Sequence, residues 1–196
     1  MNSLISTIGL AVAANAAVQP RGCQNPTVVQ NFDLNAYLGL WYEIVRDKDT
    51  SYENGICNTA NYSIKADGHI RVLNNEYYSD TQKWGGGEGD AYVVDATKDE
   101  GYLKVKFVPN VPAGDYKVIA TDYDNYAVIY SCIGLGPFLS QEYVWVLART
   151  PEVTEATKQE VIASLKSQIP KYDIFQNGAY TPQAPAYPCP YSSAPQ

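Results

Sequence analysis

The chain has 196 residues, which is enough for one domain with a sizeable core and too few for two ordinary ones. Its formal net charge is −7, and the charged residues are spread along the chain. The basic stripe on which nucleic-acid binders depend is missing, so we expect no nucleic-acid partner and a soluble protein.

The N-terminal residues 1–16 are predicted to be a signal peptide. Leu4 to Ala14 is uncharged and mostly apolar, and Ala14-Asn15-Ala16 is a small-x-small cleavage pattern. The run is too short to span a bilayer comfortably, and no later segment approaches the roughly 20 apolar residues that a spanning helix needs. We therefore expect a secreted, extracellular protein.

The central part of the chain alternates short strand-like segments with turn residues. The alternation is clearest at Leu103-Lys104-Val105-Lys106-Phe107, where apolar and charged side chains take opposite faces. Eight strands joined by short links predict an all-β fold, an antiparallel up-and-down barrel whose closure removes the exposed sheet edges. The predicted strands are 39–47, 57–65, 69–78, 88–95, 102–108, 115–121, 125–132 and 142–149.

One α-helix is predicted after the eighth strand. Thr154 can cap it, Pro170 ends it, and an apolar stripe of Val161, Ile162, Leu165 and Ile169 is expected to pack on the outside of the barrel. Barrel and helix together make a domain of residues 17–180. The Pro-rich tail, residues 181–196, is expected to be extended and tethered by Cys189.

Cysteine usage agrees with export. Cys23, Cys57, Cys132 and Cys189 are widely spaced, contain no C-x-x-C pair, and accompany a single histidine, His69. This pattern disfavours a metal site and favours two disulfides in an oxidising compartment. The sequence alone permits three pairings.

The longer connections fall at one end of the predicted barrel, which is therefore expected to be its open end, or mouth. They are 48–56, 79–87, 109–114 and 133–141, and two of them carry apolar side chains. Exposed apolar clusters commonly mark contacts. We expect either a docking surface for a membrane, a lipoprotein or a second copy of the chain, or a lid over the ligand. Its residues are Trp84, Leu135, Pro137, Phe138 and Leu139.

Three motifs in order carry a family resemblance. Residues 31–44, NFDLNAYLGLWYEI, are built on Gly39-x-Trp41; residues 121–132 read TDYDNYAVIYSC; and residues 144–150 read VWVLART. The chain resembles the lipocalins from Cys23 to about Pro190. Within that family it most resembles the apolipoprotein D-like, bilin-binding and crustacyanin-like branch.

The resemblance implies structural roles for several of these residues. It pairs Cys23 with Cys132 and Cys57 with Cys189. It makes Trp41 the barrel floor with Arg149 stacked across it, where a guanidinium over an indole is worth roughly 1–2 kcal/mol. The signature residues expected to be structural are Gly39, Trp41, Thr121, Asp122, Tyr123 and Arg149.

Strand parity indicates which side chains face the ligand. Asn61-Tyr62-Ser63 is a glycosylation sequon, and a glycan on Asn61 must face outward, so Tyr62 points into the barrel. The resemblance places a ligand cavity at the positions of Tyr62, Asn74, Tyr116 and Trp145. The expected binding residues, mostly apolar with a few polar groups, are Tyr62, Val72, Asn74, Phe107, Tyr116, Tyr143, Trp145 and Leu147.

The predicted function is the binding and transport of a small hydrophobic or amphipathic molecule, such as a bilin, a sterol or a fatty acid, with no cofactor required. A bilin or carotenoid pigment protein is an alternative. A lipocalin-type isomerase is disfavoured because it needs a free thiol, and haem ligation by His69 is disfavoured because that residue follows a turn. We expect no enzyme activity.

Overall fold

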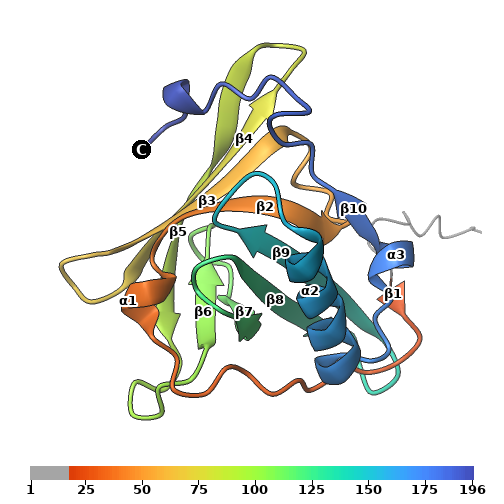
Figure 1. Cartoon of the computed structure of the whole chain (residues 1–196). Coiled ribbons are helices and arrows are strands. Elements are labelled where there is room, and N and C mark those ends of the chain that lie inside the picture. Colours follow the sequence, from red (N-terminus) through yellow and green to blue (C-terminus); the bar gives the residue numbers. More distant parts are fainter. Residues whose placement is uncertain (1–17) are drawn as a thin grey trace, which may run out of the picture.

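The computed structural model describes residues 18–196. The predicted signal peptide, residues 1–16, lies outside the described residues. Eight strands run antiparallel, each bonded to the next along the chain (Figure 1). They are β2 (Gly39–Asp47), β3 (Ile56–Ile64), β4 (Ile70–Tyr78), β5 (Lys83–Val93), β6 (Tyr102–Lys106), β7 (Gly114–Thr121), β8 (Tyr126–Gly134) and β9 (Ser140–Ala148).

The sheet closes on itself because β9 pairs with β2 as well as with β8. Tyr42 lies opposite Ala148, and Arg46 lies opposite Trp145, with a β-bulge between Glu43 and Val45. The predicted eight-stranded barrel is confirmed. β2 has the predicted bounds, whereas β5 begins at Lys83 rather than at residue 88, so Trp84 lies within a strand and not in a mouth loop.

Two apolar clusters hold the barrel together. The inner cluster fills the lower barrel and includes Trp41, Tyr62, Val72 and Ile129. The outer cluster lies between the sheet and the helix α2 (Glu155–Gln168). The sequence placed this helix correctly: the Thr154 hydroxyl accepts a hydrogen bond from the backbone N–H of Thr157, and the stripe of Val161, Leu165 and Ile169 is buried.

Short elements that the sequence did not predict complete the fold. They are β1 (Val18–Gln19), paired with β9, the one-turn helices α1 (Leu34–Tyr37) and α3 (Ile174–Asn177), β10 (Gly178–Tyr180), and a 3₁₀ turn η1 (Tyr191–Ser193). Of these, α1 matters most for a binding site. The Asp33 side chain caps it, and its Tyr37 is buried in the inner cluster.

The C-terminal segment forms part of the barrel wall. β2 pairs with β3 only as far as Tyr42, and beyond that point β10 takes over the free edge of β2. Gln183 then donates from Nε2 to the carbonyls of Glu43 (2.7 Å) and Asn58 (2.8 Å), one on each strand. The segment from β10 to Gln183 therefore fills a seam between β2 and β3.

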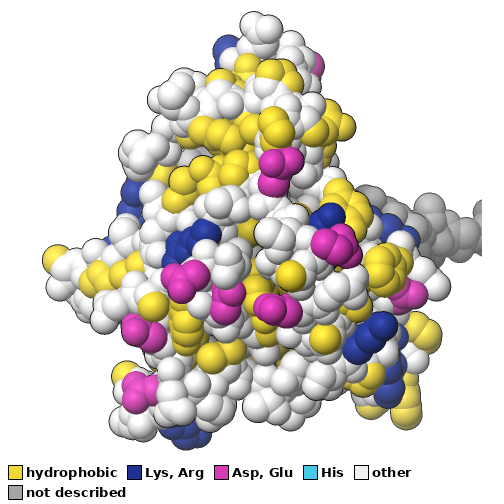
Figure 2. Space-filling view, viewed as in Figure 1, with side chains coloured by type: hydrophobic (Ala, Val, Ile, Leu, Met, Phe, Trp, Pro, Cys, Tyr) yellow, Lys and Arg dark blue, Asp and Glu magenta, His cyan; other side chains and the backbone are white. Residues whose placement is uncertain are grey.

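The tail is held by more contacts than the predicted bond at Cys189. Cys57 and Cys189 are joined, as the resemblance implied. Farther on, the Trp84 indole donates to the Ser193 hydroxyl (3.1 Å), and Asn75 donates to the carbonyl of Pro195 (3.1 Å). Figure 2 shows apolar side chains gathered over the upper part of the molecule, where the tail and the β4–β5 hairpin lie in Figure 1.

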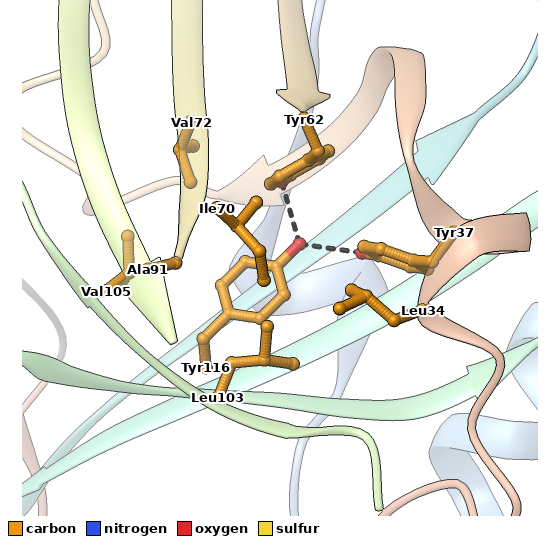
Figure 3. A pocket seen from close by; sticks show the side chains of 9 residues that line it. All are labelled: Leu34, Tyr37, Tyr62, Ile70, Val72, Ala91, Leu103, Val105 and Tyr116. Carbon is orange, nitrogen blue, oxygen red and sulfur yellow. Dashed lines mark hydrogen bonds between the residues drawn. The ribbon is translucent and has the colours of Figure 1, made fainter. Parts of the chain in front are cut away.

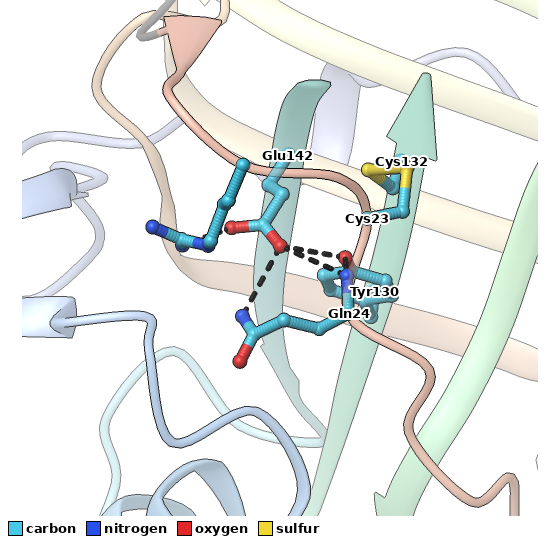
Figure 4. Close-up of a disulfide and its surroundings, with 6 residues drawn as sticks. Cys23, Gln24, Tyr130, Cys132 and Glu142 are labelled. Carbon is cyan, nitrogen blue, oxygen red and sulfur yellow. Dashed lines mark hydrogen bonds and ion pairs between the residues drawn. A yellow bond between two sulfur atoms is a disulfide. The ribbon is translucent and has the colours of Figure 1, made fainter. Parts of the chain in front are cut away.

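The N-terminal arm is fixed to the outside of the barrel by the other disulfide, Cys23–Cys132, which is also the implied pairing. Figure 4 shows the buried carboxylate of Glu142 beside it. That carboxylate accepts from the Tyr130 hydroxyl (2.8 Å) and from Nε2 of Gln24 (3.1 Å), and it forms an ion pair with Arg21. The N-terminal arm thus buries the Glu142 carboxylate and also supplies its hydrogen-bond and ion-pair partners.

Candidate functional site

The barrel floor is made by Trp41 and Arg149. The guanidinium carbon lies 3.6 Å from the centre of the indole ring. The same guanidinium donates to the carbonyls of Tyr123 (2.9 Å), Leu40 (2.9 Å) and Ala36 (2.7 Å). It therefore ties α1, β2 and the β7–β8 turn together, and both side chains are engaged in these contacts.

The other signature residues shape the same end. Gly39 has a φ of +92°, which a residue without Cβ adopts freely, and it packs beside Arg149. In the β7–β8 turn, the Thr121 hydroxyl donates to the carbonyl of Tyr126, and Asp122 accepts from the backbone N–H groups of Asn125 and Tyr126. Tyr123, also in left-handed backbone, accepts at its hydroxyl from the backbone of Asp33.

Above the floor, three tyrosine hydroxyls meet inside the barrel (Figure 3). The Tyr116 oxygen lies 2.7 Å from that of Tyr37 and 2.8 Å from that of Tyr62. Burial raises the pKa of all three phenols, so each is a neutral hydroxyl. Apolar side chains complete this ring of contacts; they are Leu34, Ile70, Val72, Ala91, Leu103 and Val105.

The room left between these side chains is about 10 Å³. That is about the space needed for one water molecule. The tyrosines and their neighbours therefore fill the lower barrel, and a ligand of any size must lie higher up or move them.

The predicted binding residues divide between these two levels. Tyr62, Val72 and Leu147 are buried in the inner cluster, and Tyr116 packs against it. The upper group is only half-buried or exposed: Tyr143 and Trp145 stack with their ring centres 5.8 Å apart, and Phe107 is 43% exposed. The last of the predicted binding residues is Asn74.

The amide oxygen of Asn74 is buried and has no hydrogen-bond partner. Asn74 shares the inward parity of Ile70 and Val72 on β4 and lies opposite Gly87 on β5. Leaving such a group unpaired costs about 1–3 kcal/mol. Buried polar atoms of this kind commonly mark a place where a ligand or a water supplies the missing donor.

Glycines on β5 make room beside Asn74. A Cβ built on Gly89 would lie 2.8 Å from the Phe107 ring, whereas one on Gly87 would meet only that ring, at 3.7 Å. Phe107 therefore lies over the glycine backbone, and the inner wall at Gly87 is open. Gly89 and Gly87 could have been found from the sequence by extending strand parity two and four residues upstream of Ala91.

None of three carboxyl groups near the predicted mouth was chosen as a site residue from the sequence; Glu43 and Glu76 are buried, and Glu53 is half-buried. Glu76 accepts from the backbone N–H groups of Asn54 (2.9 Å) and Gly55, which fixes the β2–β3 loop. Glu53, on that loop, accepts from the Trp145 indole (3.1 Å) and shares a hydrogen bond with Glu43. Burial, followed by the neighbouring charge of Glu43, raises the pKa of Glu53 to about 8.

A second hollow of about 40 Å³ lies outside the barrel, between α2, α3 and the sheet. Its rim carries Phe175 and Tyr180, both highly exposed. Among the described residues, none that line this hollow has a buried side-chain polar atom without a partner. The barrel interior, where Asn74 has one, is the better candidate for a specific site.

The fold and this site define a class of protein. The family model for the lipocalin-like domain matches residues 32–176, and the chain belongs to that family. The motif-based resemblance to its apolipoprotein D-like branch is confirmed by curated relatives. Apolipoprotein D of Cavia porcellus is 40% identical over 155 residues, covering 78% of this chain and 80% of the relative.

A bacterial relative matches equally well. The outer membrane lipoprotein Blc of Escherichia coli K12 is 41% identical over 155 residues, covering 79% of this chain and 81% of the relative. Among solved structures, lobster apocrustacyanin A1 superimposes with a TM-score of 0.73 at 21% identity, covering 90% of this chain and 95% of that one. Insecticyanin from Manduca sexta gives 0.74 at 25% identity, with coverage of 87% and 91%.

These findings support the binding of a small hydrophobic ligand inside the barrel. No helix in residues 18–196 has both the length and the apolar character to cross a membrane.

Proposed function

We propose that this protein is a secreted carrier that holds a small hydrophobic or amphipathic molecule in the upper barrel, without catalysis. The observation that carries the proposal is the Asn74 amide oxygen, buried without a partner on the inner face of β4, with the Phe107 ring beside the facing glycines of β5. Burying roughly 400 Å² of apolar ligand surface gives on the order of 10 kcal/mol before association costs, which is enough for micromolar to nanomolar binding.

Filling the cavity tests the proposal. Gly87→Trp places an indole into the open part of the inner wall, whereas Glu88→Trp places the same ring on the outer face one residue away. We expect an environment-sensitive hydrophobic dye to bind the wild type and Glu88→Trp, and to bind Gly87→Trp at least about tenfold more weakly. Equal binding by both variants, or no binding by the wild type, would contradict a barrel site.

Export is supported by the disulfides, since such bonds persist in oxidising compartments. Asn61 lies on β3 opposite Leu40 and Leu73, with the outward parity that a glycan requires. Expression of the full chain in a eukaryotic secretory cell tests both points. We expect the protein in the medium, with a glycosidase-sensitive mass that Asn61→Gln removes; retention inside the cell would contradict secretion.

A binding role rather than an enzymatic one is supported by the state of the thiols. All four cysteines are in disulfides, so the nucleophile that a lipocalin-type isomerase needs is lacking. Thiol titration of the unreduced protein is expected to give no reactive group, and one thiol per chain would reopen the enzymatic reading.

A pigment is the second candidate ligand. A bilin or carotenoid is a planar, largely apolar molecule, and a bilin carries pyrrole N–H groups that match the unpartnered acceptor of Asn74. The visible absorption spectrum of protein purified from its source tests this candidate. A strong band that is lost on organic extraction supports a pigment, and a colourless protein with an extractable lipid contradicts it.

The apolar β8–β9 loop is proposed to contact a membrane, a lipoprotein or a second copy of the chain. Phe138 is 77% exposed, and Leu135 and Leu139 are about half exposed. Trp84 does not belong to this surface, because it is half-buried against the tail. Phe138→Ser is expected to reduce liposome binding or the solution mass; no change in either would refute the contact.

A further inference from the structure

The upper barrel contains more acid than base. The Glu43 carboxyl group is buried and that of Glu53 is half-buried, and the two are hydrogen-bonded to each other. The one cation in contact with this pair, among the residues that the structure describes, is Arg46, whose Nη1 lies 2.9 Å from a Glu43 oxygen. That nitrogen also donates to the Thr181 hydroxyl (3.1 Å), so it is fully engaged.

One guanidinium balances one of the two carboxylates. The cluster is therefore neutral only while Glu53 keeps its proton. Burial, followed by the neighbouring charge of Glu43, raises the pKa of Glu53 to about 8. Besides Glu43 and Arg46, the titratable groups that act on or feel Glu53 are the phenols of Tyr52 and Tyr62, which are also neutral. A positive charge bound beside Glu53 would favour the ionised form of its carboxyl group.

The Asn74 amide oxygen, which has no hydrogen-bond partner, also favours a ligand that donates a hydrogen bond. The Asn74 oxygen is an acceptor that lacks a donor, and it comes from β4 rather than from β2 or its loop. Two independent features of the interior thus present oxygen atoms to the ligand. Neither offers a free positive charge to a carboxylate.

We propose that the barrel selects apolar molecules whose polar end carries a nitrogen-borne hydrogen-bond donor, above all a protonated amine, and discriminates against carboxylates. This inference rests on the proposed carrier function, since it specifies the ligand class of the same site. When the ammonium group binds, Glu53 gives its proton to the solvent, and the resulting carboxylate pairs with the ammonium. Asn74 offers a further acceptor to such a ligand.

Three ligands that share the same alkyl chain and differ only in the polar end show how much that end contributes to the affinity. Dodecylamine, dodecanol and dodecanoate are titrated below their micelle concentrations into the wild type at pH 7, by calorimetry. We expect dodecanol to bind, dodecylamine to bind at least about tenfold more tightly than dodecanoate, and amine binding to release about one proton. The release is measured from the enthalpy difference between two buffers of unlike ionisation enthalpy.

Two variants locate the effect. Glu53→Gln keeps the size of the side chain and its bonding to Trp145, and it is expected to abolish both the proton release and the preference for dodecylamine over dodecanoate. Glu88→Gln makes the same chemical change on an exposed outward residue and is expected to behave as the wild type.

The outcomes distinguish a failure of the ligand-class inference from a failure of the carrier function. If dodecanol binds while dodecanoate binds as tightly as dodecylamine, or if Glu53→Gln keeps the amine preference, the ligand-class inference is overturned and the carrier function stands. If none of the three ligands binds the wild type, the carrier function itself fails.

Discussion

The guanidinium of Arg149 lies flat against the indole of Trp41, 3.6 Å from the ring centre, and donates hydrogen bonds to backbone carbonyls of three different segments. A planar group with five donors suits this position, and a lysine ammonium does not. The contact closes the end of the barrel opposite the predicted mouth.

Arg149→Lys is expected to lower the free energy of unfolding by about 1–3 kcal/mol, because the stacking on Trp41 is weakened and at least one of the bonded carbonyls loses its charged donor. Urea unfolding followed by fluorescence measures the change. Arg71→Lys, at a half-exposed residue paired with Glu88 on the outer face, serves as the control and should stay within about 0.5 kcal/mol of the wild type. Equal effects of the two substitutions would refute the special role of the floor.

Tyr116→Phe is expected to destabilise the protein by about 1–3 kcal/mol. The Tyr116 hydroxyl bridges those of Tyr37 and Tyr62, so its removal leaves two buried hydroxyls unpaired. Tyr92→Phe removes a hydroxyl from an exposed residue and should have little effect. Thermal unfolding of both variants gives the comparison, and a melting temperature for Tyr116→Phe equal to that of Tyr92→Phe would contradict the buried network.

Removal of the Cys57–Cys189 disulfide by the double substitution to serine is expected to cost up to about 5 kcal/mol, since the bond closes a separation of 132 residues. The tail should also become protease-sensitive, because its contacts with β2 and β3 then lack their covalent anchor. Limited proteolysis with mass analysis checks this expectation. A tail that stays resistant would show that hydrogen bonds alone hold it.

Stability should fall as the pH rises from about 4.5 to about 8. Burial and the charge of Glu43 raise the pKa of Glu53 from its ordinary value of 4.5 to about 8. Between these limits the folded protein holds a proton that the unfolded chain has lost, so raising the pH favours unfolding. Other carboxyls contribute their own dependence, and the measurement is therefore a difference between two proteins.

The comparison protein for this pH effect is Glu53→Gln, which cannot ionise. Urea unfolding of both proteins at pH 5 and pH 8 should show that the variant gains stability relative to the wild type at the higher pH. A wild-type-to-variant difference that is the same at both pH values would show that Glu53 titrates normally.

The sequence predicted the barrel because its strands carry a two-residue alternation that survives along most of their length, as at Leu103 to Phe107. The same parity placed Tyr62, Tyr116 and Trp145 inside. The helix could also be predicted from the sequence, since Thr154 and Pro170 mark its ends. The start of β5 was missed because its three successive glycines, Gly85 to Gly87, carry no side chains and so no pattern.

What escaped prediction depends on contacts between distant segments. α1 has four residues and β10 three, which are too short for a periodic signal. Glu53 lies on a loop, and its burial follows from the way that loop turns back toward Trp145, 92 residues later. An isolated glutamate in a loop is ordinarily solvated, so composition and spacing gave no reason to place it inside the barrel.

The seam between β2 and β3 has a consequence for biosynthesis. Residues 178–183 complete the wall, so a growing chain that has emerged only as far as α2 can pair its eight strands but leaves the upper edges of β2 and β3 bare. Exposed strand edges recruit other strands. The barrel wall therefore stays open until the C-terminal segment arrives and Cys189 pairs with Cys57.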